Sequence, residues 1–287
     1  MRFAITASDS SLGVFDAFLN AGWEPMKLFA VSAQGGLDSN HKVIERALSR
    51  GINVQLSRMT EHDLQDLGED GCDVLIVAGY KWRIGDWRPY LKHAVNFHPS
   101  PLPDARGPYP MVRAILESRK SWAVSCHRVD ADFDTGDVLA AETFPLSDSE
   151  CHESLNLKIQ MANIRLAERV AGNFPALWHQ AMPQGAGSYW PKLDQQDRVI
   201  DFTHSVDSIM RQIRAFGLIE CQAQLNGIQI YVRRAVGWEE MHSHLPGTVA
   251  HVNNKSIVVA AQNGYIGIIE WSIASTDSSK IFSGQPG

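Results

Sequence analysis

Residues 73–78 read Asp-Val-Leu-Ile-Val-Ala, an apolar run without interruption. Such a run is typical of a strand that is buried on both faces of a parallel sheet. Apolar strands and helical spacings alternate around it, in the order Arg2–Thr6, Leu12–Ala21, Met26–Val31, His41–Arg50, Thr60–Leu67 and Ala94–Phe97. This alternation predicts an α/β fold with a Rossmann-like, mainly parallel sheet and flanking helices.

The pattern then gives two more strands, Ala123–Val129 and Val138–Phe144, and a long helix with an apolar face that runs from Leu155 to Val170. Pro175 is expected to kink or end that helix. After residues 185–187, which resemble a linker, short strands dominate, and Asn-Gly at 226–227 predicts a hairpin. We therefore predict an α/β domain at residues 1–184 and a small β-rich, open-barrel-like domain at residues 188–287.

Composition narrows the class of protein. The chain has 287 residues, of which 44% are apolar and 20% charged, and its net charge is −6. An acidic balance disfavours a general nucleic-acid binder. No apolar run approaches the roughly 20 residues that span a bilayer, and the N-terminus lacks the core of a signal peptide. The four cysteines form no CxxC pair, so zinc spacings are absent and a reduced, cytoplasmic protein without membrane contact is expected.

Residues 96–107 read Asn-Phe-His-Pro-Ser-Pro-Leu-Pro-Asp-Ala-Arg-Gly. Asn96 and His98 lie two residues apart on the expected strand, so their side chains point to the same side. They lie at its carboxyl end, where open α/β sheets bind ligands. An amide N–H beside an imidazole suits an oxyanion pocket. A plain structural interpretation, in which both side chains only satisfy loop backbone groups, fits these residues equally well.

Residues 130–137 read Asp-Ala-Asp-Phe-Asp-Thr-Gly-Asp. Asp130, Asp132 and Asp134 have the spacing that opens an EF-hand calcium loop. However, Gly136 falls at position seven instead of six, and Ala141 stands at position twelve, where Glu is needed. No metal is therefore expected. Asp134, beside Thr-Gly, is the carboxylate best placed on a tight turn that faces a cleft, and a plain acidic turn suffices for the others.

An Asn, a His and an Asp from two strand ends make a set for general acid–base and oxyanion chemistry without a nucleophile. The sequence has no G-x-S-x-G, no G-x-G-x-x-G and no Walker A motif. These absences disfavour an α/β-hydrolase, a dinucleotide enzyme and a P-loop enzyme.

The two stretches, in this order and spacing, resemble the signature of the formyltransferases that use 10-formyltetrahydrofolate. The resemblance covers about residues 1–180. A weaker similarity, from Ser188-Tyr189-Trp190-Pro191-Lys192 through Ile213-Arg214-Ala215-Phe216, is to the start of the C-terminal domain of methionyl-tRNA and amino-sugar formyltransferases. Pro101 stands where the family usually has Leu, and Ala105 where it often has an aromatic residue.

The resemblance implies roles for three residues. Asn96 and a protonated His98 would hold the formyl oxygen as it gains negative charge. Asp134 would orient His98, raise its pKa, and help to move the proton that the attacking amine loses. The formyl group would pass directly to the amine, so no covalent enzyme intermediate is expected.

The resemblance also implies where the ligands bind. The folate would lie against the loop after the fourth strand, which here contains Tyr80, Trp82, Arg83 and Ile84, with Asp134 closing the site. Tyr80 and Trp82 are equally compatible with ordinary packing.

For the acceptor amine we expect contacts from Ser100, Arg106 and Tyr109. Arg106 would pair with an acidic group on the acceptor or brace its own loop. The crowded prolines and the resemblance together predict a cis peptide bond between Leu102 and Pro103.

The acceptor itself is open among the family's substrates, which are initiator methionyl-tRNA, nucleotide-linked amino sugars, hydroxyornithine side chains and glycinamide ribonucleotide. From Ser188 onward, eight basic residues stand against nine acidic ones, whereas tRNA binding needs a basic surface. A local cluster of arginines 211, 214, 233 and 234 is still compatible with the sequence. The enzyme for glycinamide ribonucleotide resembles only the first domain.

We therefore expect a small amine or a nucleotide-linked amino sugar as acceptor, with methionyl-tRNA as the alternative. Two further alternatives keep the fold but change the activity. One is a hydrolase that releases formate from 10-formyltetrahydrofolate, and the other is a non-catalytic folate-binding protein. The sequence leaves the oligomeric state open.

Overall fold

The computed structural model describes residues 1–30 and 39–273. The expected end of the second strand at Val31 therefore lies outside the described residues. The chain divides into two compact units, of which the first comprises residues 1–110, 121–145 and 157–191. The second comprises residues 111–120, 146–156 and 192–287. A domain boundary at residues 184–188 stays a prediction.

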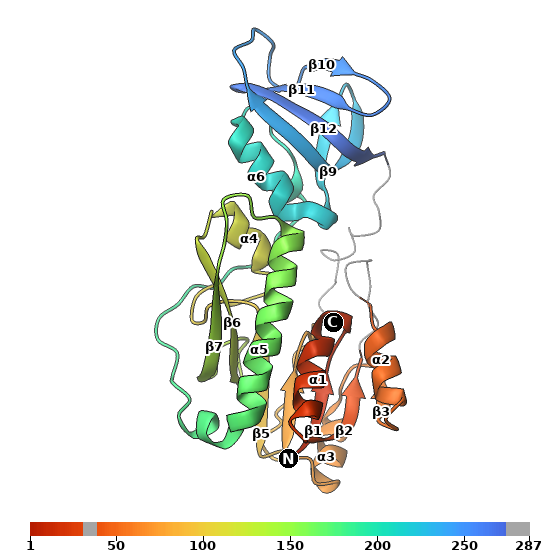
Figure 1. The fold of residues 1–287 in the computed structure, drawn as a ribbon, viewed down its shortest axis with the longest axis vertical. Coiled ribbons are helices and arrows are strands. Elements are labelled where there is room, and N and C mark those ends of the chain that lie inside the picture. The colour runs from red at the N-terminus through yellow and green to blue at the C-terminus, as the bar shows by residue number, and fades with distance from the viewer. Residues whose placement is uncertain (31–38, 274–287) are drawn as a thin grey trace. The chain divides into compact units, whose positions relative to one another are not determined.

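A seven-stranded sheet forms the centre of the first unit, in the spatial order β3-β2-β1-β4-β5-β6-β7 (Figure 1). Its strands are β1 (Arg2–Thr6), β2 (Glu24–Phe29), β3 (Asn53–Gln55), β4 (Val74–Val77), β5 (His93–His98), β6 (Ser121–Arg128) and β7 (Val138–Pro145). Strands β1 to β5 pair in parallel, and β6 pairs antiparallel with both β5 and β7. The mainly parallel sheet with flanking helices is thus confirmed.

The helices of this unit follow from their sequences. They are α1 (Leu12–Asn20), which follows a 3₁₀ turn at Asp9–Ser11, α2 (His41–Leu48), α3 (Glu61–Glu69) and most of α5 (His152–His179). Thr60 caps α3 by accepting the N–H of Asp63, whose side chain returns a bond to the N–H of Thr60, a capping box. In α5 the backbone leaves helical angles at Asn173, two residues before Pro175, so the expected kink is present.

The core lies where the apolar run predicted it. All four residues of β4 are buried, as a strand with helices over both faces requires. In Figure 1, α5 runs along β6 and β7, and Arg165 of α5 pairs with Glu142 of β7 at 2.8 Å. Among the described residues, no helix is long and apolar enough to cross a membrane.

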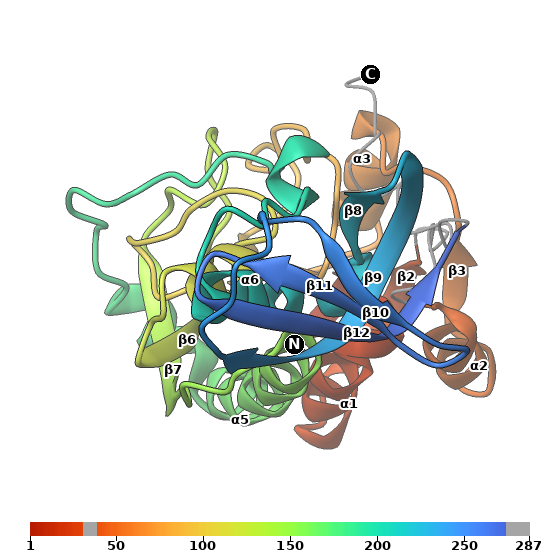
Figure 2. The ribbon, with the colours of Figure 1, turned by 90° about the horizontal axis from the view of Figure 1, so that it is seen from above.

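The second unit contains an antiparallel sheet of five strands, in the order β10-β11-β12-β9-β8. Its elements are α4 (Met111–Leu116), 3₁₀ turns at Gln196–Arg198 and Gly217–Ile219, α6 (Val206–Phe216), β8 (Cys221–Leu225), β9 (Ile228–Glu239), β10 (Val249–Val252), β11 (Ile257–Ala261) and β12 (Gly264–Ser272). Figure 2 looks onto this sheet, with α6 behind it. Asn226 and Gly227 both adopt positive φ in the β8–β9 turn, as the predicted hairpin requires.

Candidate active site

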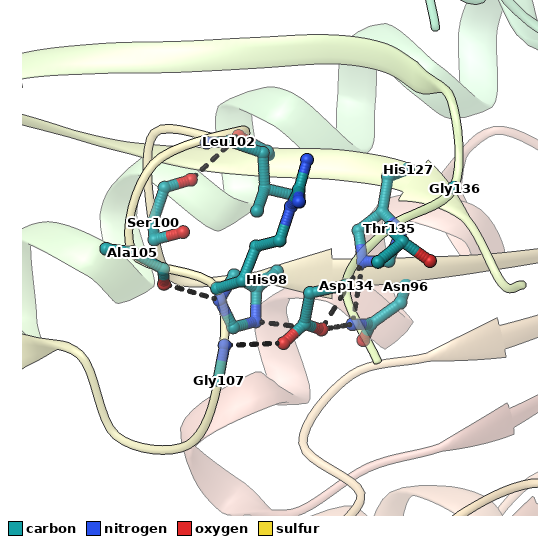
Figure 3. A network of polar contacts seen from close by, with 12 residues as sticks. Asn96, His98, Ser100, Leu102, Ala105, Gly107, His127, Asp134, Thr135 and Gly136 are labelled. Atoms are coloured by element: carbon teal, nitrogen blue, oxygen red, sulfur yellow. Dashed lines mark hydrogen bonds and ion pairs between the residues drawn. The ribbon is translucent and has the colours of Figure 1, made fainter. Parts of the chain in front are cut away.

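Asn96 and His98 end β5, and Asp134 lies in the connection from β6 to β7. The structure brings these three predicted residues together (Figure 3). His98 Nδ1 lies 3.3 Å from Asp134 Oδ1, and Asn96 Nδ2 lies 3.4 Å from the same oxygen. The other carboxylate oxygen, Oδ2, accepts the N–H of Gly107 at 2.9 Å. Asp134 therefore joins the end of β5 to the loop that follows it.

The turn that carries Asp134 needs its particular residues. Asp134 has φ of 59°, in the left-handed region that Asp tolerates better than most residues. A Cβ on Gly136 would lie 2.1 Å from the carbonyl oxygen of Arg128, so only glycine allows this close approach to the end of β6. The backbone therefore requires glycine at position 136, and it suits an aspartate at position 134.

Two opposed effects act on the pKa of His98. Burial of the ring lowers it, because a charged imidazole is costly to desolvate. The carboxylate of Asp134 acts in the other direction but does not outweigh burial. The carboxylate of Asp134 therefore raises this pKa, as expected, but the net shift is downward because desolvation of the buried ring is the larger effect.

The hydrogen-bond geometry of His98 nevertheless suits a charged ring. Nδ1 faces the carboxylate of Asp134, and Nε2 lies 3.3 Å from the carbonyl oxygen of Ala105. Both neighbours are acceptors, and only an imidazolium donates from both nitrogens. A neutral ring that donates from Nδ1 keeps its lone pair on Nε2. The site can therefore take up a proton at Nε2 and hold the resulting charge with two existing acceptors.

Asp134 is an anion at neutral pH. Burial by itself would raise the pKa of its carboxyl, but His127, His98 and the N–H of Gly107 together hold the pKa below its ordinary value. Its side chain is only 10% exposed. A buried carboxylate that stays charged can orient His98 and stabilise the imidazolium form.

His127, in β6, is a member of the site that the sequence analysis missed. Its Nε2 lies 3.0 Å from Asn96 Nδ2 and 3.7 Å from Asp134 Oδ1. Its Nδ1 lies 2.7 Å from the carbonyl oxygen of Arg128, so we assign a ring hydrogen to Nδ1. In the neutral ring Nε2 then accepts from Asn96, whereas the charged ring donates from Nε2 toward Asp134. The available signal was a lone histidine in an apolar strand expected beside Asn96.

These contacts occupy the amide of Asn96. With Nδ2 facing both His127 and Asp134, both of its hydrogens point at protein acceptors. The 3.4 Å contact to Asp134 is the longer and weaker one. If Asn96 is to donate to a formyl oxygen, the hydrogen that points at Asp134 must turn away from that carboxylate.

The loop after β5 holds the residues predicted to contact the acceptor. The peptide bond between Leu102 and Pro103 is cis, which confirms that prediction. Ser100 is fully buried, and its hydroxyl donates to the carbonyl of Asp104 at 2.9 Å. Arg106 Nε donates to Gln184 Oε1 at 2.9 Å. Both side chains brace the loop in this structure.

Tyr109 is partly buried and has φ of 60°. As acceptor ligands, Ser100, Arg106 and Tyr109 stay predictions.

The residues predicted to bind folate divide into two groups. Tyr80 and Ile84 pack against the core cluster around β4 and α3, and the hydroxyl of Tyr80 accepts the N–H of Met59 at 2.7 Å. Trp82 is partly buried against Tyr80, and the exposed Arg83 donates to the carbonyl of Ala131 in the β6–β7 connection. Arg83 thus contacts the connection that carries Asp134. As folate ligands, all four stay predictions.

Comparison with known protein families identifies the family of the chain. Residues 33–170 match the formyl transferase family, and residues 192–283 match the formyl transferase C-terminal domain. The chain therefore belongs to the formyl transferase family and is an enzyme that transfers formyl groups. The resemblance described from the sequence is confirmed.

Individual relatives are similar over most of their length. The methionyl-tRNA formyltransferase of Orientia tsutsugamushi is 28% identical over 214 residues, which cover 72% of this chain and 69% of the relative. That of Bordetella petrii is 27% identical over 248 residues, covering 79% and 77% of the two chains.

Solved structures share the fold at lower identity. An N-formyltransferase from Helicobacter canadensis, solved with folinic acid and dTDP-3-aminofucose, is 15% identical with a TM-score of 0.67 and covers 94% of this chain and 99% of its own. HypX from Aquifex aeolicus is 19% identical with a TM-score of 0.70, and the match covers 93% of this chain but only 45% of HypX.

Proposed function

We propose that this enzyme transfers the formyl group of 10-formyltetrahydrofolate to a primary amine at Asn96, His98 and Asp134. The observation that carries the proposal is the buried His98–Asp134 pair, 3.3 Å apart, beside the amide of Asn96. Structures of relatives with folinic acid or tetrahydrofolate support a folate donor. A cytoplasmic location, where such donors are used, stays a prediction.

The reaction needs one proton transfer and no nucleophile from the protein. The amine nitrogen attacks the formyl carbon, the bond from that carbon to N10 of the folate breaks, and the proton lost by the amine ends on N10. As the carbonyl oxygen gains negative charge, Asn96 and a charged His98 donate to it. His98 donates from Nε2, so its 3.3 Å contact with the carbonyl of Ala105 must give way to the formyl oxygen. Asp134 stabilises the charge on His98 throughout, and no covalent enzyme intermediate forms.

We propose a compact amine or a nucleotide-linked amino sugar as the acceptor. Charge in the second unit supports this choice, because three of the four arginines of the candidate basic cluster face carboxylates, and the fourth, Arg214, donates to the carbonyl of Asp148. Arg211, Arg233 and Arg234 each lie within 4 Å of a carboxylate, those of Asp207, Glu220 and Glu270 respectively. A surface neutralised in this way offers little attraction to phosphates. The sugar N-formyltransferases among the solved structures agree with this choice.

Methionyl-tRNA is the second candidate, and one observation favours it. The similar proteins named above from Orientia tsutsugamushi and Bordetella petrii are methionyl-tRNA formyltransferases and match most of the chain. A tRNA acceptor would need basic side chains to leave their carboxylate partners on binding.

A direct competition separates the candidates. The protein is given saturating 10-formyltetrahydrofolate with charged initiator tRNA and dTDP-linked amino sugars, each alone and together, and formylated products are identified by mass spectrometry. We expect formylated sugar. Formyl-methionyl-tRNA with no sugar product would replace the first acceptor by the second. Formate release without any amine would show that the protein is a hydrolase instead of a transferase. Donor binding without turnover would identify a folate-binding protein.

A further inference from the structure

The segment from Met182 to Trp190, which we call the clasp, lies against both loops that carry the site. The sequence predicted a linker here because of Gly185 and Gly187. The structure shows a paired segment instead. At its beginning, Met182 exchanges two backbone hydrogen bonds with Val138, each of 2.9 Å, at the start of β7. The clasp therefore begins beside the turn that holds Asp134.

The far end of the clasp holds the loop after β5. The Oγ of Ser188 accepts the N–H of Ala105 at 2.9 Å, and its carbonyl accepts the N–H of Arg106 at 2.9 Å. Trp190 then donates its N–H to the carbonyl of Arg106 at 2.7 Å. Ala105 is the residue whose carbonyl faces Nε2 of His98. The clasp thus fixes one of the two acceptors around the imidazole.

Two glycines allow the backbone of the clasp and the loop after β5 to approach each other closely. A Cβ on Gly187 would lie 2.1 Å from the carbonyl oxygen of Pro103, and a Cβ on Gly107 would lie 2.5 Å from the carbonyl oxygen of Trp190. Real Cβ atoms do not reach such distances. Both glycines are therefore explained by tight contact between the clasp and the loop, which is the opposite of a flexible linker.

Gln184 lies in the middle of the clasp and makes three hydrogen bonds. Its Nε2 donates to the carbonyl of Asp134 at 2.9 Å and to the carbonyl of Gly136 at 2.7 Å. Its Oε1 accepts Nε of Arg106 at 2.9 Å. Two carbonyls require the amide nitrogen and the guanidinium requires the amide oxygen, so the orientation of the amide is fixed.

We propose that Gln184 is a positioning residue for formyl transfer, which holds the Asp134 turn against the loop after β5. The proposal rests on the proposed function of Asn96, His98 and Asp134. Gln184 touches the backbone on both sides of Thr135 and does not touch the catalytic carboxylate. It acts by keeping the turn in the left-handed conformation that aims Asp134 at His98 and Gly107.

The physical reason is the strain in the turn. A non-glycine residue with positive φ costs roughly 1 kcal/mol or more and persists only where its surroundings hold it. The amide of Gln184 donates to the carbonyls of Asp134 and Gly136 and so holds the turn at two points. Without these hydrogen bonds the turn can relax, the carboxylate moves, and a misplacement of about 1 Å in a reacting group can cost about a hundred-fold in rate.

Two variants separate the contacts that Gln184 makes. Gln184→Met keeps the length of the side chain and removes all three hydrogen bonds. Gln184→Glu keeps an oxygen for Arg106 and sets a carboxylate against the carbonyls of Asp134 and Gly136. If the turn is what matters, both variants lose kcat by between about ten- and a hundred-fold, with KM for the folate donor little changed. If only the bond to Arg106 matters, Gln184→Glu is as active as the parent.

Nuclear magnetic resonance gives two readouts that need no acceptor. The first is the titration of the His98 imidazole, followed through its ring nitrogens. With Asp134 less well held, the opposing effect of its carboxylate weakens, so the pKa of His98 should fall further in Gln184→Met, which adds no charge of its own. The second is hydrogen exchange of the Gly107 amide, which should speed up because Asp134 Oδ2 is its acceptor. Gln180→Met is the matched control, since Gln180 is an exposed glutamine just before the clasp.

The outcomes decide the proposal separately from the proposed function. Unchanged His98 titration in Gln184→Met, with unchanged Gly107 exchange in both Gln184 variants, would overturn it, even where formyl transfer by the parent is proven. Equal changes in Gln180→Met would also overturn it. If His98→Ala and Asp134→Asn leave formyl transfer intact, the proposed function fails, and the two readouts still report whether Gln184 holds the turn.

Discussion

Asp134→Asn is the sharpest test of the site, because it removes one charge and almost no volume. The parent carboxylate accepts from Gly107, Asn96 and His98. An asparagine can still accept the N–H of Gly107 through its oxygen, which turns its amide nitrogen toward His98. His98 must then present a lone pair at Nδ1 and carry its hydrogen on Nε2, facing Ala105. We expect the fold to persist and the histidine tautomer to reverse.

The size of the effect follows from the distance. An imidazolium and a carboxylate 3.3 Å apart attract each other by about 5 kcal/mol at an effective dielectric constant of about 20. This attraction exceeds the roughly 1 kcal/mol of a neutral hydrogen bond. Loss of the charge should therefore matter more than the change in hydrogen bonding that the asparagine brings. If the transition state needs a charged His98, losing that attraction costs at most about four powers of ten in rate. We expect kcat to fall by about 10²- to 10⁴-fold, the range of a lost general acid or base.

The assay has two parts. Formyl transfer from 10-formyltetrahydrofolate is measured for the parent and the variant with the acceptor found in the competition experiment. The ring nitrogens of His98 are assigned in both proteins, and circular dichroism checks the fold. Turnover within three-fold of the parent, or a hydrogen that stays on Nδ1 of His98 in the variant, would refute the reasoning.

Three further predictions concern other parts of the molecule. Gly136→Ala sets a methyl group 2.1 Å from the carbonyl oxygen of Arg128, so calorimetry should show a lower Tm and a stability loss of about 1–3 kcal/mol; an unchanged Tm would contradict the backbone argument. Asp63 is paired with Lys27, which holds the pKa of its carboxyl below the ordinary 3.8. The stability that this carboxylate contributes is therefore present above that value and lost as pH falls through the folded pKa. Between pH 6 and pH 3 the Asp63→Asn protein should lose less stability than the parent does, as measured by urea unfolding. His98→Ala should lower formyl transfer by at least about 10²-fold with the fold intact, and near-parent turnover would remove His98 from the site.

The sequence predicted the parts of the candidate site that show a local pattern. Asn96 and His98 follow from their spacing at the end of β5, and Asp134 follows from its turn motif. His127 could not be found in this way, because it joins the site through the register of an antiparallel pair in which it stands opposite Asn96. A pattern of single residues gives the face of a strand but not which residue on its neighbour lies opposite.

The pairing of the clasp could not be predicted from the sequence, for a related reason. Gly185 and Gly187 predict a flexible backbone when only local conformation is considered. The demand for glycine at Gly187 arises instead from Pro103, which is far away in the chain. The net pKa of His98 likewise depends on burial, which no neighbour in the sequence reveals.

The second unit is assembled from three separate stretches of chain, and α4, one of the early stretches, packs against α6. This arrangement bears on how the second unit can be exchanged between relatives by recombination. A single crossover near residue 188 would give a hybrid with α4 from one parent and α6 from the other, and with mismatched side chains where the two helices meet. A hybrid that keeps the second unit intact must therefore take residues 111–120 and 146–156 from the same parent as the rest of that unit. Hybrids that exchange the second unit should therefore exchange all three stretches at once.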